Sequence, residues 1–336
     1  MSGPAPMIDA GRLDAFLRGA LPGLEGTPRL TPISGGQSNP TFFVTYENRA
    51  LVLRKQPPGE LLPSAHAVDR EHRIISALAA TDVPVPPALL YCDDRSVVGT
   101  PFYVMDKVEG RVFHDCTLPG VPPADRHAMY LAMARTLAAL HNVDVAQADL
   151  SDYGRPGNYF ARQVSRWSRQ WEQIRTRDDA NIERLIRWLP DNIPPDETSG
   201  IVHGDYRIGN LMFHPTEPRV VAVLDWELST LGHPLADLAH SAMAWVSSPD
   251  EYGGIAGLDL DALQIPSREA YVAAYEGVAR HGARLRPFHM AFALFRWSMI
   301  FEGIAARAKA GTASADNAAE TGRLAAAFAQ RAVDEI

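Results

Sequence analysis

Three polar side chains stand at short intervals in residues 201–227, IVHGDYRIGNLMFHPTEPRVVAVLDWE. Asp205 follows a short apolar run, Asn210 comes five residues later, and Asp225 closes another apolar run. Carboxylate and amide oxygens are ligands that Mg²⁺ accepts, and a carboxylate can also take a proton from a hydroxyl. We expect these groups to sit at the ends of neighbouring short strands, where they can converge on one ligand. The chemistry they suit is phosphoryl transfer, in which the protein mainly positions groups and stabilises charge.

Phosphoryl transfer also needs backbone N–H groups and a cation on the phosphates. Upstream, a small-residue turn contains Gly35, Gly36, Gln37 and Ser38. Their N–H groups could approach phosphates because the glycines put no Cβ in the way. The turn is neither a Walker A sequence nor a complete G-x-G-x-x-G, so an ordinary hairpin remains the alternative. Arg54 or Lys55, at the end of an apolar run, could supply the cation.

The pattern H-x-D-x-x-x-x-N, followed by an apolar strand that ends in Asp, resembles the catalytic core of the protein-kinase-like superfamily. The stretches HGDYRIGNLMF and AVLDWE are more closely similar to the aminoglycoside phosphotransferase and choline kinase branch. The order and spacing of elements extend this resemblance over roughly residues 30–310.

The resemblance implies ATP and Mg²⁺ as cofactors, Asp205 as the catalytic base, and Asn210 and Asp225 as metal ligands. Glu227 could reach a second metal, and His203 would brace the loop. Asp237 matches the family pattern too, and a structural role suits it better than chemistry. The alternative is that His203 and Asp205 are a turn pair and that Asp225 caps the end of a strand.

By the same resemblance, Arg54 stands where the family carries a phosphate-contacting lysine on its third strand. Lys55 would point to the opposite face, because strand side chains alternate. Glu71 resembles the helix glutamate that pairs with that cation, although its charged neighbours leave a solvated helix face as the alternative. The strand end from Asp106 to Val108 resembles the inter-lobe hinge, which binds adenine through backbone groups.

The phosphate acceptor is less defined by the sequence. A polycationic aminoglycoside would need a cluster of carboxylates in the second lobe, and the sequence shows no such cluster. Residues 288–309 are instead apolar and aromatic, with three interspersed cations. Residues 152–171 resemble the branch related to kinase-like domains fused to acyl-CoA dehydrogenases. That resemblance implies a small-molecule hydroxyl acceptor, for example an acyl-CoA or similar metabolite. An aminoglycoside-type antibiotic kinase stays open as an alternative.

Two further classes of function compete with a kinase. A metal-dependent hydrolase would take a transition metal on imidazole and carboxylate ligands. Its candidate ligands are His203, Asp205, Asp225, His233, Asp237 and His240. The other rival is an inactive nucleotide-binding scaffold, against which the retained Asp205 speaks.

Composition narrows the partners and the compartment. The 336 residues have 46% hydrophobic and 21% charged content, as in folded proteins, and a formal charge of −8. This charge gives no basic field for nucleic acid or an anionic membrane surface. The two cysteines, Cys92 and Cys116, form no disulfide framework, and no secretory signal or membrane-length apolar run is evident. We expect a soluble cytoplasmic protein without nucleic-acid or membrane partners.

The elements that must position these residues follow from periodicity and from Gly and Pro breaks. Residues 1–106 predict a small antiparallel sheet with one covering helix, and residues 107–336 a mainly helical lobe. The expected fold class is α+β, with the two lobes of a protein-kinase-like fold. In the first lobe we predict helices at 9–21 and 65–80 and strands at 30–33, 41–46, 51–53, 88–91 and 101–105. In the second we predict a hairpin region over 201–227 and helices at 122–141, 158–175, 181–189 (stopped by Pro190), 235–246, 267–281, 287–310 and 313–332.

Overall fold

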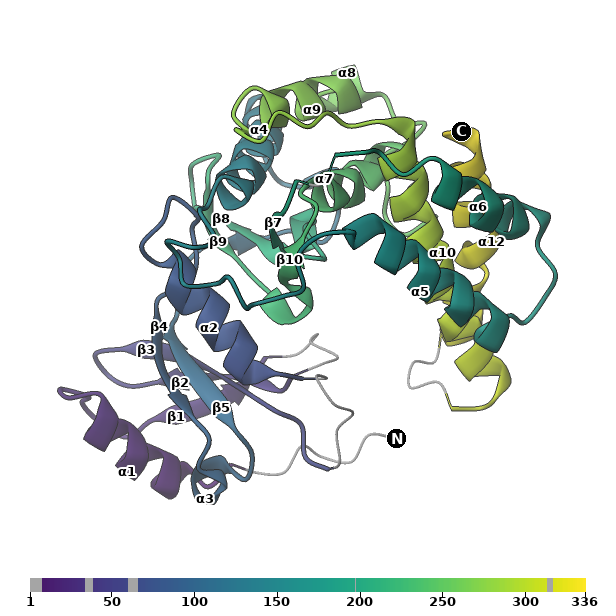
Figure 1. Cartoon of the computed structure of the whole chain (residues 1–336). Coiled ribbons are helices and arrows are strands. Elements are labelled where there is room, and N and C mark those ends of the chain that lie inside the picture. Colours follow the sequence, from purple (N-terminus) through teal and green to yellow (C-terminus); the bar gives the residue numbers. More distant parts are fainter. Residues whose placement is uncertain (1–7, 34–38, 60–65, 197, 313–316) are drawn as a thin grey trace. The chain divides into compact units, whose positions relative to one another are not determined.

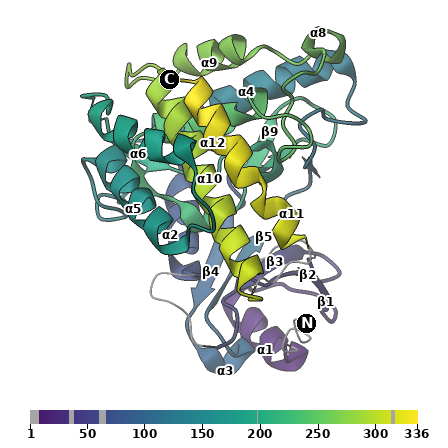
Figure 2. The same ribbon diagram turned by 90° about the vertical axis from the view of Figure 1, so that its right-hand side faces the viewer.

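The computed structural model describes residues 8–33, 39–59, 66–196, 198–312 and 317–336 (Figures 1 and 2). The chain forms two compact units. The first comprises Met1–Gly110 and Val221–Leu228, and the second Arg111–Val220 and Ser229–Ile336. The sequence analysis places a single boundary after residue 106. The first unit instead ends four residues later and also takes in a segment from the middle of the chain.

An antiparallel five-stranded sheet, in the order β1-β2-β3-β5-β4, forms the first unit (Figure 1). Its strands are β1 (Arg29–Pro32), β2 (Thr41–Thr45), β3 (Ala50–Lys55), β4 (Ala88–Cys92) and β5 (Phe102–Asp106). Its helices are α1 (Ala10–Ala20), α2 (Val68–Leu78) and the unexpected short α3 (Arg95–Val98). Asp9 caps the start of α1 by accepting from the N–H groups of Gly11 and Arg12, which would otherwise lack a partner in the first turn.

The alternation of strand β3 separates its two cations. Leu51 and Leu53 enter the apolar core of the unit, and Lys55 follows them on that face. Lys55 is buried and donates its ammonium hydrogen bond to the carbonyl of Val98 at the end of α3. Arg54 therefore stands on the opposite face of the sheet, as the alternation predicts.

Residues 221–228 attach to the first unit through backbone and side-chain contacts. The N–H of Val223, at the end of β9 (Val220–Val223), donates to the carbonyl of Pro84 at 2.8 Å. The next turn, η2 (Trp226–Leu228), contacts α2. Between them Asp225 has a left-handed backbone with φ +61°, a conformation that Asp tolerates better than most residues. This kink directs the chain from β9 into η2.

In the second unit, a buried helix organises the surrounding helices (Figure 2). It is α10 (Pro287–Lys309), which packs against α5, α6, α7 and α12 and has 14 of its 23 residues buried. A helix that is apolar on nearly all sides belongs in a core, which explains the aromatic run in this part of the sequence. The helices are α4 (Pro123–His141), α5 (Tyr159–Ile174), α6 (Ala180–Asp191), α7 (Leu235–Ala242), α8 (Leu260–Leu263), α9 (Arg268–Glu276), α11 (Ala318–Gly322) and α12 (Leu324–Asp334), with 3₁₀ turns η1 (Ile208–Asn210) and η3 (Met243–Trp245).

Short strands frame the loop that carries Asp205. Strand β7 (Gly200–Val202) pairs antiparallel with β10 (Thr230–Gly232), and β6 (Arg111–Val112) pairs antiparallel with β8 (Leu211–Phe213). In the hairpin region expected over residues 201–227, strand 200–202 therefore pairs outside the region, with β10. Its partner β10 has only three residues and gives too weak a periodic signal to be predicted.

Two helix boundaries in the second unit also differ from the predictions. Pro190 lies inside α6, one residue before its end, so the helix lacks one backbone hydrogen bond in its last turn and ends just after the proline. The single helix expected over residues 313–332 is two helices, α11 and α12. At the break, a Cβ added to Gly322 would lie 2.7 Å from the Cβ of Ala305 on α10, so only glycine permits this approach. Among the described residues, no helix has both the length and the apolarity needed to cross a bilayer.

Candidate functional site

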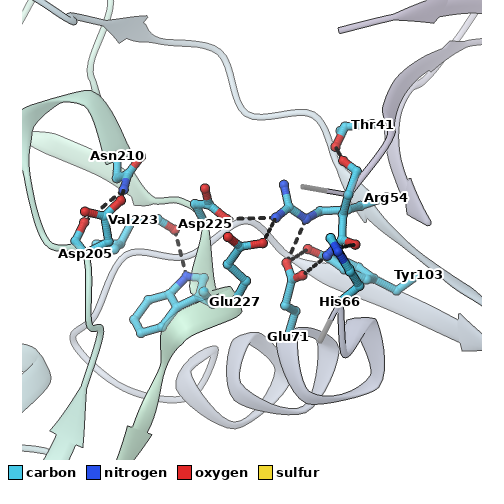
Figure 3. Close-up of polar contacts among 12 residues, drawn as sticks. Thr41, Arg54, His66, Glu71, Tyr103, Asp205, Asn210, Val223, Asp225 and Glu227 are labelled. Atoms are coloured by element: carbon cyan, nitrogen blue, oxygen red, sulfur yellow. Dashed lines mark hydrogen bonds and ion pairs between the residues drawn. The ribbon is translucent and has the colours of Figure 1, made fainter. Parts of the chain in front are cut away.

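Arg54 is surrounded by carboxylates in the first unit (Figure 3). Its Nε lies 2.8 Å from a carboxylate oxygen of Glu71, and its Nη2 lies 2.7 Å from Asp225 and 3.6 Å from Glu227. The side chain is only 13% exposed. These four residues come from β3, α2 and the 221–228 segment. The structure thus brings together the predicted cation, its predicted helix partner and the acid predicted to hold metal.

Glu71 is buried and held by neutral donors as well as by Arg54. It accepts hydrogen bonds from Nδ2 of Asn39 at 2.6 Å and from the hydroxyl of Tyr103 at 3.2 Å. His66 in turn contacts Oδ1 of Asn39 at 3.1 Å, which orients the Asn39 amide toward Glu71. A solvated helix face, the alternative for Glu71, is therefore wrong. Its i+3 and i+4 neighbours Ile74 and Ile75 are also buried, on a helix that contacts strands β4 and β5.

Burial and charge act on this cluster in opposite directions. Burial raises the pKa of Glu71 to about 7, although the Arg54 guanidinium lowers it. Burial alone would lower the pKa of Arg54. The net effect is a raised pKa, because the negative charge of Glu71, and then of Tyr103, Asp225 and Glu227, stabilises the guanidinium. The guanidinium is thus a permanent cation on the face of the sheet that is turned toward α2.

The donor chemistry of Asp225 and Glu227 fits Mg²⁺. Both are carboxylates that reach the same Nη2 of Arg54, so their oxygens lie near each other, and Mg²⁺ prefers such hard oxygen ligands. No group of three or more His, Cys, Asp or Glu in the described parts of the chain is arranged to hold a metal without further ligands. Mg²⁺ commonly keeps few protein ligands and completes its shell with water and phosphate oxygens.

Asp205 lies in a polar loop of the second unit, where both of its carboxylate oxygens are held. Nδ2 of Asn210 donates to Oδ2 at 2.8 Å and to the backbone carbonyl of Asp205 at 2.9 Å (Figure 3). Nε2 of His240 lies 3.1 Å from Oδ1, and Nε of Arg207 lies 3.4 Å from Oδ2. The NH₂ group of Asn210 donates both of these bonds to Asp205, so the amide oxygen can bind another partner. That oxygen has the chemistry of a Mg²⁺ ligand.

Asp237, at the start of α7, fixes the backbone of the same loop. Its carboxylate accepts from the N–H of His203 at 2.6 Å and from the N–H of Gly204 at 2.8 Å. Nδ1 of His203 accepts from the N–H of Asp205 at 3.2 Å, and Arg296 of α10 donates to the carbonyl of Gly204 at 2.9 Å. Asp237 and His203 are therefore braces of the loop. Arg296, one of the three cations in residues 288–309, is a third brace.

The electrostatics around Asp205 favour its ionised form. Burial alone would raise the pKa of Asp205, but its hydrogen bond with His240, with Arg207 and His203 nearby, holds it well below its usual range. Burial lowers the pKa of His240, so this imidazole is neutral near pH 7. Asp205 is thus a charged carboxylate with fixed geometry and can accept a proton from a nearby hydroxyl.

A pocket in the second unit opens beside this loop. It encloses about 630 Å³, part of it open to solvent, and includes Arg207 and His240 in its lining. The other side chains that shape it are mainly apolar or aromatic, among them Met133, Trp297 and Phe328. None of the described residues that line it is an aspartate or glutamate. The pocket suits an apolar body rather than a polycation.

The remaining predicted site residues have other surroundings. The carboxylate of Asp106, at the end of β5, forms a bidentate pair with Arg49 at 2.9 and 3.0 Å, so its side chain is committed to the sheet. Only its backbone remains for the hinge role predicted from the resemblance. Val108 is half-buried in the connection that follows. Gly35, Gly36, Gln37 and Ser38 lie outside the described residues.

Sequence reasoning missed the roles of three residues of these clusters: Asn39 and Tyr103, which hold Glu71, and His240, which it named as a ligand of the alternative hydrolase. A signal for His240 exists in the sequence. It follows Asp237 by three residues, which places both on one face of α7. The ligand set of the alternative hydrolase is not assembled. His203 and Asp237 bond the loop backbone, and His233 instead faces Asp196 at 3.5 Å.

Comparison with known proteins places these features in a family. Residues 29–288 match the model of the phosphotransferase enzyme family. Acyl-CoA dehydrogenase family member 11 of Gallus gallus is 42% identical over 338 residues, which cover 97% of this chain and 43% of that protein. The chain spans less than half the length of these curated relatives.

Solved structures agree with this assignment. A structure from Ralstonia eutropha JMP134, described provisionally as an aminoglycoside phosphotransferase, is 43% identical, covers 98% of both chains and has a TM-score of 0.89. A thermostable mutant of aminoglycoside phosphotransferase APH(4)-Ia, in a complex with AMP-PNP and hygromycin B, shares the fold. It is 16% identical, with a TM-score of 0.61 over 95% of this chain and 98% of the other. The α+β, protein-kinase-like fold predicted from the sequence is confirmed, and the chain belongs to the phosphotransferase enzyme family.

Proposed function

We propose that this phosphotransferase uses ATP and Mg²⁺ to transfer the γ-phosphate to a hydroxyl group of a small molecule. The observation that carries the proposal is the state of Asp205: an ionised carboxylate, held on both oxygens, at the edge of an apolar pocket. The complex of APH(4)-Ia with AMP-PNP supports a nucleotide as phosphate donor.

In this proposal Asp205 accepts the proton of the acceptor hydroxyl. The acceptor oxygen forms a bond to the γ-phosphorus while the bond between that phosphorus and the β–γ bridging oxygen breaks, which releases ADP. Asn210 and Asp225 would hold Mg²⁺, which offsets the negative charge of the phosphates when it is bound. Arg54, kept in place by Glu71, supplies a permanent cation for the nucleotide phosphates.

The backbone groups of Gly35, Gly36, Gln37 and Ser38 would contact the phosphates, and those of the hinge at Asp106 and Val108 would contact the adenine. Both assignments rest on the sequence resemblance. The side chain of Asp106 is engaged with Arg49, which suits a role for its backbone alone.

We further propose that the acceptor is an acyl-CoA-type or similar metabolite rather than an aminoglycoside. The pocket beside Asp205 is largely apolar, and an aminoglycoside would need carboxylates that its described lining lacks. The relation to acyl-CoA dehydrogenase family members points in the same direction. We also propose that the acceptor is a free metabolite in the cytoplasm. The formal charge of −8 gives no basic field that would attract nucleic acid or an anionic membrane.

Calorimetry with Mg²⁺-ATP tests the nucleotide and metal parts of the proposal. We expect the unmutated chain to bind and Asp225→Ala to bind at least about tenfold more weakly, because it loses a metal ligand. Glu217→Ala is a matched control, since Glu217 is an exposed acid that pairs locally with Arg219 and His214. Absence of binding by the unmutated chain, or equal binding by Asp225→Ala, would contradict the proposal.

A screen that measures ADP release tests the acceptor. It should offer hydroxyacyl-CoAs, sugars, amino alcohols and aminoglycosides at equal concentration. We expect hydroxyacyl-CoAs to give the highest kcat/KM and Asp205→Asn to lower the rate of ADP release by at least about 100-fold. Preferential turnover of an aminoglycoside would establish the antibiotic kinase instead.

A further inference from the structure

His240 links the proposed base to a buried tryptophan. On one side, its Nε2 lies 3.1 Å from Oδ1 of Asp205. On the other, Nε1 of Trp297, from α10, donates to Nδ1 of His240 at 2.9 Å. His240 is 5% exposed and Trp297 is 8% exposed, and both line the pocket beside Asp205. The chain Trp297–His240–Asp205 therefore runs from the helical core to the carboxylate.

The chemistry of tryptophan decides which imidazole nitrogen carries the proton. An indole N–H can only donate, so Nδ1 of His240 must be the acceptor. In a neutral imidazole the proton then resides on Nε2, which faces Asp205. Burial keeps the ring neutral by lowering the pKa of His240. The carboxylate thus receives a hydrogen bond with a defined direction.

This bond complements the one from Asn210. His240 holds Oδ1 and Asn210 holds Oδ2, so together they prevent rotation of the carboxylate about its Cβ–Cγ bond. A carboxylate that accepts a proton must present a lone pair to the acceptor hydroxyl at hydrogen-bond distance. Misplacement of a reacting group by about 1 Å can cost a factor of ~10² in rate.

We propose that His240, held in its Nε2–H form by Trp297, is a positioning residue that aims the Asp205 carboxylate at the acceptor hydroxyl. The proposal rests on the phosphotransferase function proposed above. It assigns no proton transfer to His240, which acts through Asp205. It also gives Trp297 a role beyond filling the core.

Steady-state kinetics of matched variants test the positioning role. His240→Gln keeps an N–H donor at the place of Nε2, whereas His240→Leu has similar volume and no donor. We expect kcat to fall roughly 10- to 100-fold in His240→Leu, with KM for ATP within about twofold and the midpoint of thermal unfolding nearly unchanged. His240→Gln should retain at least about a third of kcat. Equal losses in both variants, or no loss in His240→Leu, would overturn the proposal.

Trp297→Phe tests the tautomer and also serves if His240→Leu does not fold. This variant removes the indole donor to Nδ1, so the orientation and tautomer of the ring depend on its bond with Asp205. We expect a smaller fall in kcat, about three- to tenfold, again without a change in KM for ATP. An unchanged kcat would overturn the role of Trp297 and the proposal with it.

NMR of ¹⁵N-histidine-labelled protein provides a readout that does not depend on turnover. The two-bond proton–nitrogen pattern of His240, assigned by its loss in His240→Gln, should be that of the Nε2–H form. A mixed or Nδ1–H pattern in the unmutated chain would overturn the proposal. If no acceptor is turned over, the proposed function fails, and this spectrum still decides the state of His240.

Discussion

At the scale of single residues, Arg54 neutralises a cluster of acidic side chains in the first unit. Three carboxylates face it, and one of them, Glu71, is 1% exposed. Removal of one partner of a buried ion pair typically costs about 3–5 kcal/mol, because the other charge stays buried. We expect Arg54→Met to lower the free energy of unfolding by roughly 3 kcal/mol and to weaken ATP binding. Urea denaturation and calorimetry measure the two effects.

Arg54→Lys is the control for this prediction. It keeps the charge but cannot reach Glu71 and Asp225 with two separate N–H groups, so its stability should fall between those of Arg54→Met and the unmutated chain. If Arg54→Met were as stable as the unmutated chain, Arg54 would not be the counter-charge of this cluster.

Asp205 permits the most direct test at this scale. Asp205→Asn preserves the size of the side chain and removes the proton acceptor. A general base commonly contributes 10²- to 10⁴-fold, so we expect kcat to fall by about that factor while the Kd for Mg²⁺-ATP changes less than about threefold. Asp196→Asn, another acid of the second unit that faces a histidine, is the control and should keep full activity. Activity retained in Asp205→Asn would remove the base from the mechanism.

At the scale of elements, the N-terminus of α10 creates a dependence of stability on pH. His289 is 1% exposed, and its Nδ1 accepts from the N–H of Arg286. Burial lowers the pKa of His289 to about 3 and that of the nearby His281 to about 4, against a usual value of 6.5. Below pH 6.5 the unfolded chain therefore takes up protons that the folded chain does not. The free energy of unfolding consequently decreases as the pH is lowered.

We expect this loss to begin near pH 6.5 and to continue until the pH reaches the folded values, about 4 and about 3. The midpoint of thermal unfolding should accordingly be lower at pH 5 than at pH 7.5. In His289→Asn, which keeps an acceptor for Arg286 but does not titrate, the difference should be smaller. An equal difference in both proteins would show that His289 contributes nothing to it.

At the scale of the whole molecule, the first unit is discontinuous in sequence. Val223 bonds to Pro84, and the 3₁₀ turn after it packs on α2 with Trp226 buried. A fragment of residues 1–110 therefore lacks part of the first unit and also loses two of the carboxylates around Arg54. We expect this fragment to unfold with little cooperativity in circular dichroism.

A second fragment provides the matched comparison. In it, residues 219–230 follow residue 110 through a flexible Gly/Ser linker. We expect this longer fragment to unfold more cooperatively than residues 1–110 alone. Equal behaviour of the two fragments would show that the 221–228 segment does not stabilise the first unit.

Much of this organisation could be predicted because it is local. Alternation along a strand was enough to predict that Arg54 and Lys55 point to opposite faces, and the family resemblance was enough to select Glu71. The strand β10 and the short helices α3 and α8 were not predicted, because three or four residues give no periodic signal. The pairing of β7 with β10 depends on residues about thirty positions apart, and no local pattern carries that information.

By itself, the sequence determined the family, the α+β fold class and the residues whose chemistry suits phosphoryl transfer, since motif spacing and residue type are properties of the chain. Only the tertiary structure decided how those residues are held. Asp225 pairs with Arg54 in the first unit, Asp106 is tied to Arg49, and His240 connects Asp205 to Trp297. The physical reason is that each of these contacts joins segments distant in sequence. Such contacts form only when burial of the core brings the segments together.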